Sequence, residues 1–92
     1  MKIMVVWKTV PGQYKTAFDQ FLKAGGPVPA GAKTAGRWHT PGSTLGWHLV
    51  ETNDLTLVAQ HVAEWADVLA CEVYPVIEDA EAGAAAKKVF GG

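Results

Sequence analysis

The run KIMVVWK, residues 2–8, constrains the fold more than any other segment, because it is apolar on both faces of a strand. Successive side chains of a strand point to opposite faces. One face carries Ile3, Val5 and Trp7, and the other carries Met4 and Val6. A strand that is apolar on both faces has to be covered on both sides. We therefore expect this strand in a sheet whose two faces are both covered.

Hydrophobic spacing and turn residues predict the elements that follow this strand. Apolar residues recur every three or four positions over residues 13–24, which indicates an amphipathic helix that Gly25-Gly26-Pro27 ends. Two strands, 32–39 and 45–51, flank the turn TPGST. The next helix has three candidate N-caps, Thr52, Asn53 and Asp54. Its apolar stripe consists of Leu57, Val58, Val62, Trp65 and Leu69. Residues 70–77 read as a strand in which Pro75 suggests either an edge position or a place at the end of the strand.

The order strand, helix, strand, strand, helix, strand is typical of the split βαβ, or ferredoxin-like, α+β fold. Two helices cover one face of a four-stranded antiparallel sheet and leave the other face open. We expect a single domain over residues 1–92 and a homodimer joined through the open sheet faces. Residues 78–92 form a tail with a helix over 78–90, which Gly83 weakens and which Val89 and Phe90 would have to anchor.

Composition excludes several classes of function. The net charge of -1 gives no basic patch for nucleic acid, and no apolar run approaches the roughly 20 residues of a membrane helix. A single cysteine, Cys71, excludes an internal disulfide and favours a cytoplasmic protein. The sequence carries neither a phosphate-binding loop nor a dinucleotide fingerprint, so we expect no cofactor.

The dipeptide Trp-His occurs twice, once on each side of the Pro-Gly turn. If residues 42–43 form a two-residue turn, Trp38 and Trp47 share one sheet face, and His39 and His48 share the other. If the loop has an odd number of residues, each tryptophan faces a histidine instead. Neither PG nor GS is a strong hairpin signal, so the sequence leaves the register open.

Two histidines are the candidate catalytic residues. His48 lies in the middle of a predicted strand, and His61 falls inside the apolar arc of the second helix, between Leu57 and Trp65. Either one suits general acid/base chemistry, although a buried, hydrogen-bonded histidine and a helix-edge histidine are the plainer interpretations. A metal site built from the histidines and Glu51 lacks any recognised ligand spacing, so we expect no metal.

Aromatic residues supply the candidate ligand-binding walls, and Arg37 supplies a candidate carboxylate clamp. The candidate ligand-binding residues are Trp7, Tyr14, Arg37, Trp38, Trp47 and Trp65. Packing in a core or an interface is the alternative for the tryptophans, and a surface position is the alternative for Arg37. Cys71 has no basic neighbour in the sequence, which favours an inert thiol.

The stretch from Gly36 to Ala82 resembles a family of short bacterial proteins of unknown function in the dimeric α/β-barrel superfamily, some labelled muconolactone-isomerase-like by analogy. The family pattern falls on Trp38, Trp47 to Glu51, Asn53-Asp54, Trp65 to Asp67, and Glu72 to Val76. Two positions depart from it, since His61 stands where the family has tryptophan and Val68 where it has leucine. The resemblance implies a dimeric barrel, and the superfamily includes cofactor-independent oxygenases, haem-degrading enzymes, isomerases and dye peroxidases. The fold alone does not choose among them.

Three functions remain open at this point. The first is a cleft between helices and sheet, lined by Trp and His, that binds a small apolar or aromatic molecule and works as a cofactor-independent oxygenase or isomerase. The second is a carrier or sensor that uses the same cleft without chemistry. The third is a purely structural dimer in which the aromatic residues form the interface. Only the first requires histidines that point into a cleft.

Overall fold

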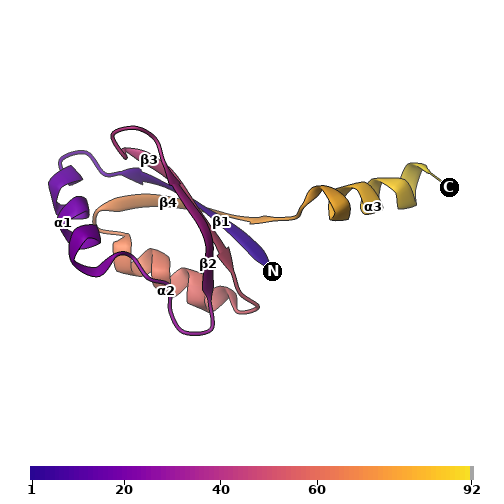
Figure 1. Ribbon diagram of the computed structural model, residues 1–92, viewed down its shortest axis with the longest axis horizontal. Helices are drawn as coiled ribbons and strands as arrows, with labels where there is room; N and C mark the ends of the chain where they lie inside the picture. Colours follow the sequence, from indigo (N-terminus) through magenta and orange to yellow (C-terminus); the bar gives the residue numbers. More distant parts are fainter. Residues whose placement is uncertain (92) are drawn as a thin grey trace.

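The computed structural model describes residues 1–91, and its elements follow the order βαββαβα. The elements are β1 (Lys2–Thr9), α1 (Tyr14–Ala24), β2 (Lys33–His39), β3 (Leu45–Glu51), α2 (Leu55–Trp65), β4 (Leu69–Val76) and α3 (Asp79–Phe90). The four strands form one antiparallel sheet in the order β2-β3-β1-β4, and α1 and α2 lie on the same side of it (Figure 1). This confirms the ferredoxin-like α+β fold, with β4 at an edge, one of the two positions that Pro75 suggested.

β1 occupies the centre of the sheet, between β3 and β4. Ile3, Val5 and Trp7 are buried on the side that faces the helices, where Val50 and Val58 complete the main core with Ile3 and Val5. On the other side of β1, Met4 and Val6 are only half-buried and Lys8 is exposed. The sheet therefore has a helix face, which α1 and α2 cover, and an open face.

The ends of the first two helices follow from local chemistry. α1 ends at Gly25, whose φ of 79° is left-handed and whose N–H donates to the Phe21 carbonyl at 2.6 Å. Of the three candidate N-caps of α2, Asp54 is the one used, and it accepts a hydrogen bond from the Thr56 N–H at 2.9 Å. Leu69, expected on the α2 stripe, instead begins β4.

The hairpin register matches one of the two alternatives that the sequence left open. Trp38 pairs with Trp47, so both rings lie on the open face, while His39 and His48 lie on the helix face. The turn is closed by the Ser43 N–H, which donates to the Thr40 carbonyl at 2.7 Å. Gly42 and Ser43 both have positive φ, 96° and 59°.

A β-bulge interrupts β2 at Ala35, and the sequence analysis did not predict it. Thr34 pairs with Val50, but Gly36 already pairs with Leu49, so Ala35 is the extra residue. An extra residue reverses the alternation of side chains along a strand. Thr34 and Arg37, three positions apart, consequently both belong to the helix face.

α3 projects from the end of β4, away from the rest of the chain (Figure 1). The radius of gyration is 15.6 Å, against about 12 Å for a compact chain of this length. A helix was predicted here, and Val89 and Phe90, the residues that would have to anchor it, are 74% and 86% exposed, since α3 buries none of its residues. Its Ala-rich sequence offers too little apolar surface to fold back on the sheet. The last residue of the predicted tail, Gly92, lies outside the described residues.

None of the helices within residues 1–91 combines the length and the apolar character needed to cross a membrane.

Candidate functional site

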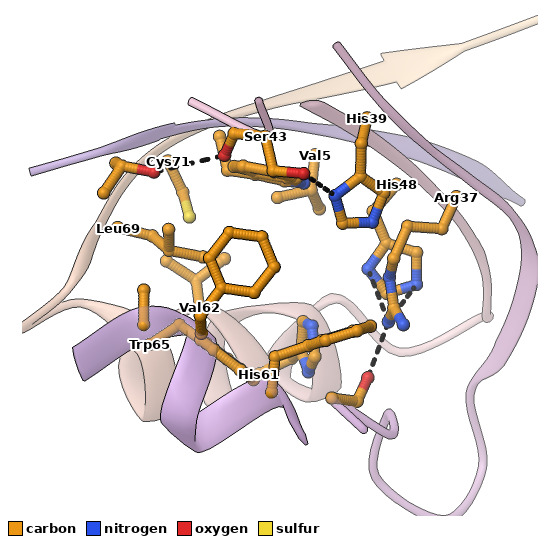
Figure 2. A pocket seen from close by; sticks show the side chains of 16 residues that line it. Val5, Arg37, His39, Ser43, His48, His61, Val62, Trp65, Leu69 and Cys71 are labelled. Atoms are coloured by element: carbon orange, nitrogen blue, oxygen red, sulfur yellow. Dashed lines mark hydrogen bonds between the residues drawn. The ribbon is translucent and has the colours of Figure 1, made fainter. Parts of the chain in front are cut away.

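A cleft opens between the helix face of the sheet and the two helices α1 and α2 (Figure 2). Its walls are mainly apolar, and they come from β1, both helices and the start of β4. The apolar lining consists of Val5, Trp7, Ala17, Phe18, Phe21, Val62, Trp65, Leu69 and Cys71. Polar side chains gather at one end, where Arg37 and His48 lie opposite Leu69 and Cys71 (Figure 2). The cleft thus has a mainly apolar body and a charged polar end, and Thr9 and Ser43 also contribute to its lining.

Arg37 enters the cleft from β2, and backbone carbonyls of the loop after α1 hold its guanidinium. Nη1 donates to the Gly25 carbonyl at 3.2 Å, and Nη2 donates to the Gly26 carbonyl at 2.6 Å. Gly26 is buried with a φ of 75°, a conformation that glycine adopts without strain. Partial burial lowers the pKa of Arg37 from its usual value, but an arginine stays charged at neutral pH.

His48, from the central strand β3, is 2% exposed and sits against this guanidinium. Its Nε2 lies 3.2 Å from Nη2 of Arg37 and 2.8 Å from the Thr34 hydroxyl. A guanidinium only donates, so the ring is the acceptor in that contact. Burial, with smaller effects of the charges of Arg37 and His61, lowers the pKa of His48 to about 3. The ring is therefore neutral at pH 7.

His61, from α2, approaches His48 edge to face, with ring centroids 5.2 Å apart. It is 7% exposed, and its Nδ1 is buried without a hydrogen-bond partner among residues 1–91. Burial, and then the charge of Arg37, lower the pKa of His61, although Glu64 and the Pro27 backbone oppose the shift. A buried imidazole nitrogen without a partner is costly, and a polar atom placed in the cleft would relieve that cost.

Trp7 contributes to the cleft because β3 carries a glycine beside it. Gly46 pairs with Trp7, and any Cβ at Gly46 would overlap the indole ring. The indole also contacts the His39 ring in a T-shaped arrangement, with centroids 5.1 Å apart. His39 is exposed at the rim, where its Nδ1 lies 3.1 Å from the Ser43 hydroxyl. Gly46 is therefore what lets Trp7 lie against the sheet.

The structure brings five of the eight candidate site residues together in this cleft: Trp7, Arg37, His48, His61 and Trp65. The other three, Tyr14, Trp38 and Trp47, do not line it. The hairpin register turns both β2–β3 tryptophans to the open face. Tyr14 instead donates a hydrogen bond from its hydroxyl to the Gly42 carbonyl at 2.7 Å, which ties α1 to the hairpin turn. The expectation that a hairpin tryptophan forms a wall of the site is corrected here, because Trp7 of β1 takes that place.

Several contributors to the site were missed by reasoning from the sequence. Phe21, one of the apolar residues that predicted the first helix, was not a candidate site residue, yet it lines the cleft, and its ring centroid lies 5.8 Å from Cζ of Arg37. Thr34 was missed because the bulge was missed, and Gly36 within a predicted strand was the available signal for one. Cys71 lines the apolar end, where burial raises its thiol pKa, in agreement with an inert thiol.

Metal-binding side chains do not cluster here. In the part of the chain that the structure describes, no three His, Cys, Asp or Glu side chains come together in an arrangement that could hold a metal ion.

The fold and the cleft define a ferredoxin-like α+β protein with a buried, cationic polar end beneath an apolar cavity. The chain belongs to the family described as Domain of unknown function (DUF3303), whose model matches residues 1–90. Comparison with curated proteins and comparison with solved structures gave no match. The family description names neither an activity nor a superfamily, so the likeness to isomerases and dimeric barrels rests on the sequence motifs alone.

Proposed function

We propose that this protein binds a small apolar or aromatic molecule in the cleft between α1, α2 and the helix face of the sheet. The observation that carries the proposal is the combination of an aromatic, apolar wall with a few buried polar groups at one end. That combination is typical of small-molecule sites, in which the apolar wall supplies affinity and the polar groups fix orientation. Trp7, Phe21 and Trp65 supply the aromatic surface.

The electrostatics of the histidines favour binding over chemistry as the primary role. Both His48 and His61 have lowered pKa values, and burial is the largest cause for each. A neutral imidazole beside a fixed positive charge is a good hydrogen-bonding group but a weak proton acceptor. The cleft is thus prepared to recognise a ligand, as a carrier or a sensor would.

Fluorescence of the neutral probe N-phenyl-1-naphthylamine tests the proposal, because its emission rises in an apolar site. Val62 lines the cleft, so Val62→Trp should fill it and weaken probe binding at least tenfold. Val89→Trp places the same ring on the exposed face of α3 and serves as the matched control, with wild-type binding expected. Circular dichroism checks that both variants fold. Absent probe binding in the wild type, or equal binding in Val62→Trp, would contradict the proposal.

Proton transfer is the second candidate function, and the unpartnered Nδ1 of His61 favours it. In this form of the proposal, His61 takes a proton from a carbon next to a carbonyl and returns it to the product, while Arg37 stabilises the intervening enolate. Such chemistry suits an isomerase, or with O₂ as a second substrate, a cofactor-independent oxygenase.

Hydrogen–deuterium exchange of 2-tetralone in D₂O, followed by proton NMR, tests this second candidate. The wild-type protein should accelerate exchange next to the carbonyl, and His61→Phe should remove the acceleration while it keeps the fold. Equal exchange rates for the two proteins would show that His61 carries no proton.

The proposal also includes a homodimer joined through the open sheet faces. That face carries apolar side chains that the chain itself covers only in part: Met4, Val6, Trp38, Leu45, Trp47, Leu49 and Tyr74. Trp38 is 53% exposed there, and large exposed apolar patches mark interaction surfaces.

Light scattering at micromolar concentration should give about twice the 9.8 kDa chain mass. Trp38→Asp should shift the mass toward one chain, whereas Leu22→Asp, which alters an exposed apolar residue of α1, should not. A wild-type mass near that of one chain would rule out this assembly.

A further inference from the structure

The polar end of the cleft contains a positive charge that no acidic side chain neutralises. Within residues 1–91, no carboxylate lies at ion-pair distance from the Arg37 guanidinium, and the recorded ion pairs join only Lys2 to Glu51 and Glu78. Its recorded neighbours are the two glycine carbonyls and the neutral His48 ring. A partly buried charge in an apolar cavity is strongly attracted to a counter-ion, since desolvation strengthens electrostatic interactions.

We propose that the ligand of this cleft is an apolar or aromatic molecule that carries one anionic oxygen group, such as a carboxylate, and that Arg37 binds this group. The inference rests on the proposed binding function and adds to it the chemical class of the ligand. The apolar body of such a molecule occupies the aromatic part of the cleft, and its anionic group lies at the end formed by β2 and β3.

The hydrogen-bonding capacity of this end fits an oxyanion. A guanidinium has five N–H donors, and the recorded contacts to Gly25, Gly26 and His48 use three of them. The N–H of Nε and one N–H of Nη1 remain without an acceptor among the described residues, and a carboxylate oxygen can accept a charge-assisted hydrogen bond from either.

The loop that holds Arg37 adds specificity, because it fixes where the charge lies. The Gly25 and Gly26 carbonyls each accept a hydrogen bond from one terminal nitrogen of the guanidinium, and Nη2 also contacts the His48 ring, which is itself bonded to the Thr34 hydroxyl. A preorganised cation binds an anion without the cost of ordering a flexible side chain. An uncharged molecule of the same shape leaves this cation without a counter-ion.

The test compares 2-naphthoate with 2-naphthamide, which share shape and differ in charge, at pH 7.5 by isothermal titration calorimetry. Wild-type protein should bind the carboxylate at least tenfold more tightly than the amide. In Arg37→Gln the preference should fall to less than threefold, with the amide affinity little changed. Lys33→Gln removes an exposed charge from the same strand outside the cleft and should keep the wild-type preference.

The outcomes separate this inference from the function on which it rests. Equal binding of the two compounds by the wild type, or an unchanged preference in Arg37→Gln, would overturn the anionic ligand while it leaves the cleft as a binding site. Binding of neither compound, together with no binding of the neutral probe, would overturn both. If Arg37→Gln fails to fold, Arg37→Lys replaces it; because an ammonium cannot reproduce the position and donors of the guanidinium, the preference should fall severalfold.

Discussion

Acidification from pH 7.5 to pH 5 should lower the free energy of unfolding, and His48 is the main reason. Burial, aided by the charges of Arg37 and His61, lowers the pKa of His48 to about 3 in the folded chain. In the unfolded chain the ring has its ordinary pKa of about 6.5. Between these two values the unfolded chain binds more protons than the folded chain, so stability decreases as the pH falls. The stabilising effect is complete above pH 6.5 and is lost on the way to pH 3.

The magnitude follows from the position of pH 5 in that window. For each pH unit below the pKa of the histidine in the unfolded chain, the free energy of unfolding falls by about 1.4 kcal/mol per group. A pH of 5 lies about 1.5 units below that pKa. His48 alone therefore lowers the free energy of unfolding at pH 5 by about 2 kcal/mol, which is a large share of the stability of a small domain. The lowered pKa of His61 acts in the same direction and adds to the loss. Asp54, whose pKa is lowered by its hydrogen bonds to Thr56, contributes only below about pH 4.

Urea unfolding followed by tryptophan fluorescence at pH 7.5, 6.5, 5.5 and 5.0 measures this effect, at one protein concentration and one ionic strength. His48→Gln is the matched variant, because the amide can still bond to Thr34 and Arg37 but does not ionise. Its loss of stability over this range should be about 2 kcal/mol smaller than that of the wild type. Parallel curves for the two proteins would refute the reasoning, since they would mean that His48 titrates alike in the folded and unfolded chains.

Three further changes have expected outcomes. Gly46→Ala should destabilise the fold by about 1–3 kcal/mol in urea unfolding, because the added methyl displaces the Trp7 ring; unchanged stability would mean that the ring has room to move. Truncation after Ile77 should shift the thermal midpoint by no more than a few degrees in circular dichroism, because α3 buries nothing, and a large drop would reveal a contact outside the single chain. Asp54→Ala should lower the free energy of unfolding by about 1 kcal/mol through loss of the α2 N-cap, while Asp54→Asn, which can still cap the helix, should lower it much less; equal losses would exclude capping as the cause.

The elements of this fold could be predicted from the sequence because their signals are local. The alternation of apolar residues identified β1 as a strand, and the glycines and proline after residue 24 ended α1. The error at Leu69 arose because an apolar stripe does not show where a helix ends. In the structure α2 ends at Trp65, and a turn follows in which the Val68 N–H donates to the Trp65 carbonyl at 3.0 Å. The signal for the tail helix was also local. Whether that helix packs against the rest of the chain is not a local property, because it depends on a surface that the chain does not place beside α3.

The candidate site was predictable only in part, since spacing along the chain does not determine which side chains meet. The sequence by itself determined the secondary structure, the fold class and the residue types of the cleft: aromatic side chains, histidines and one arginine. Only the tertiary structure decided the hairpin register, which turned Trp38 and Trp47 away from the cleft and His48 into it, and the bulge at Ala35, which brought Thr34 and Arg37 to the same side. The physical reason is the two-residue period of a strand, in which a shift of one position moves every side chain to the opposite face.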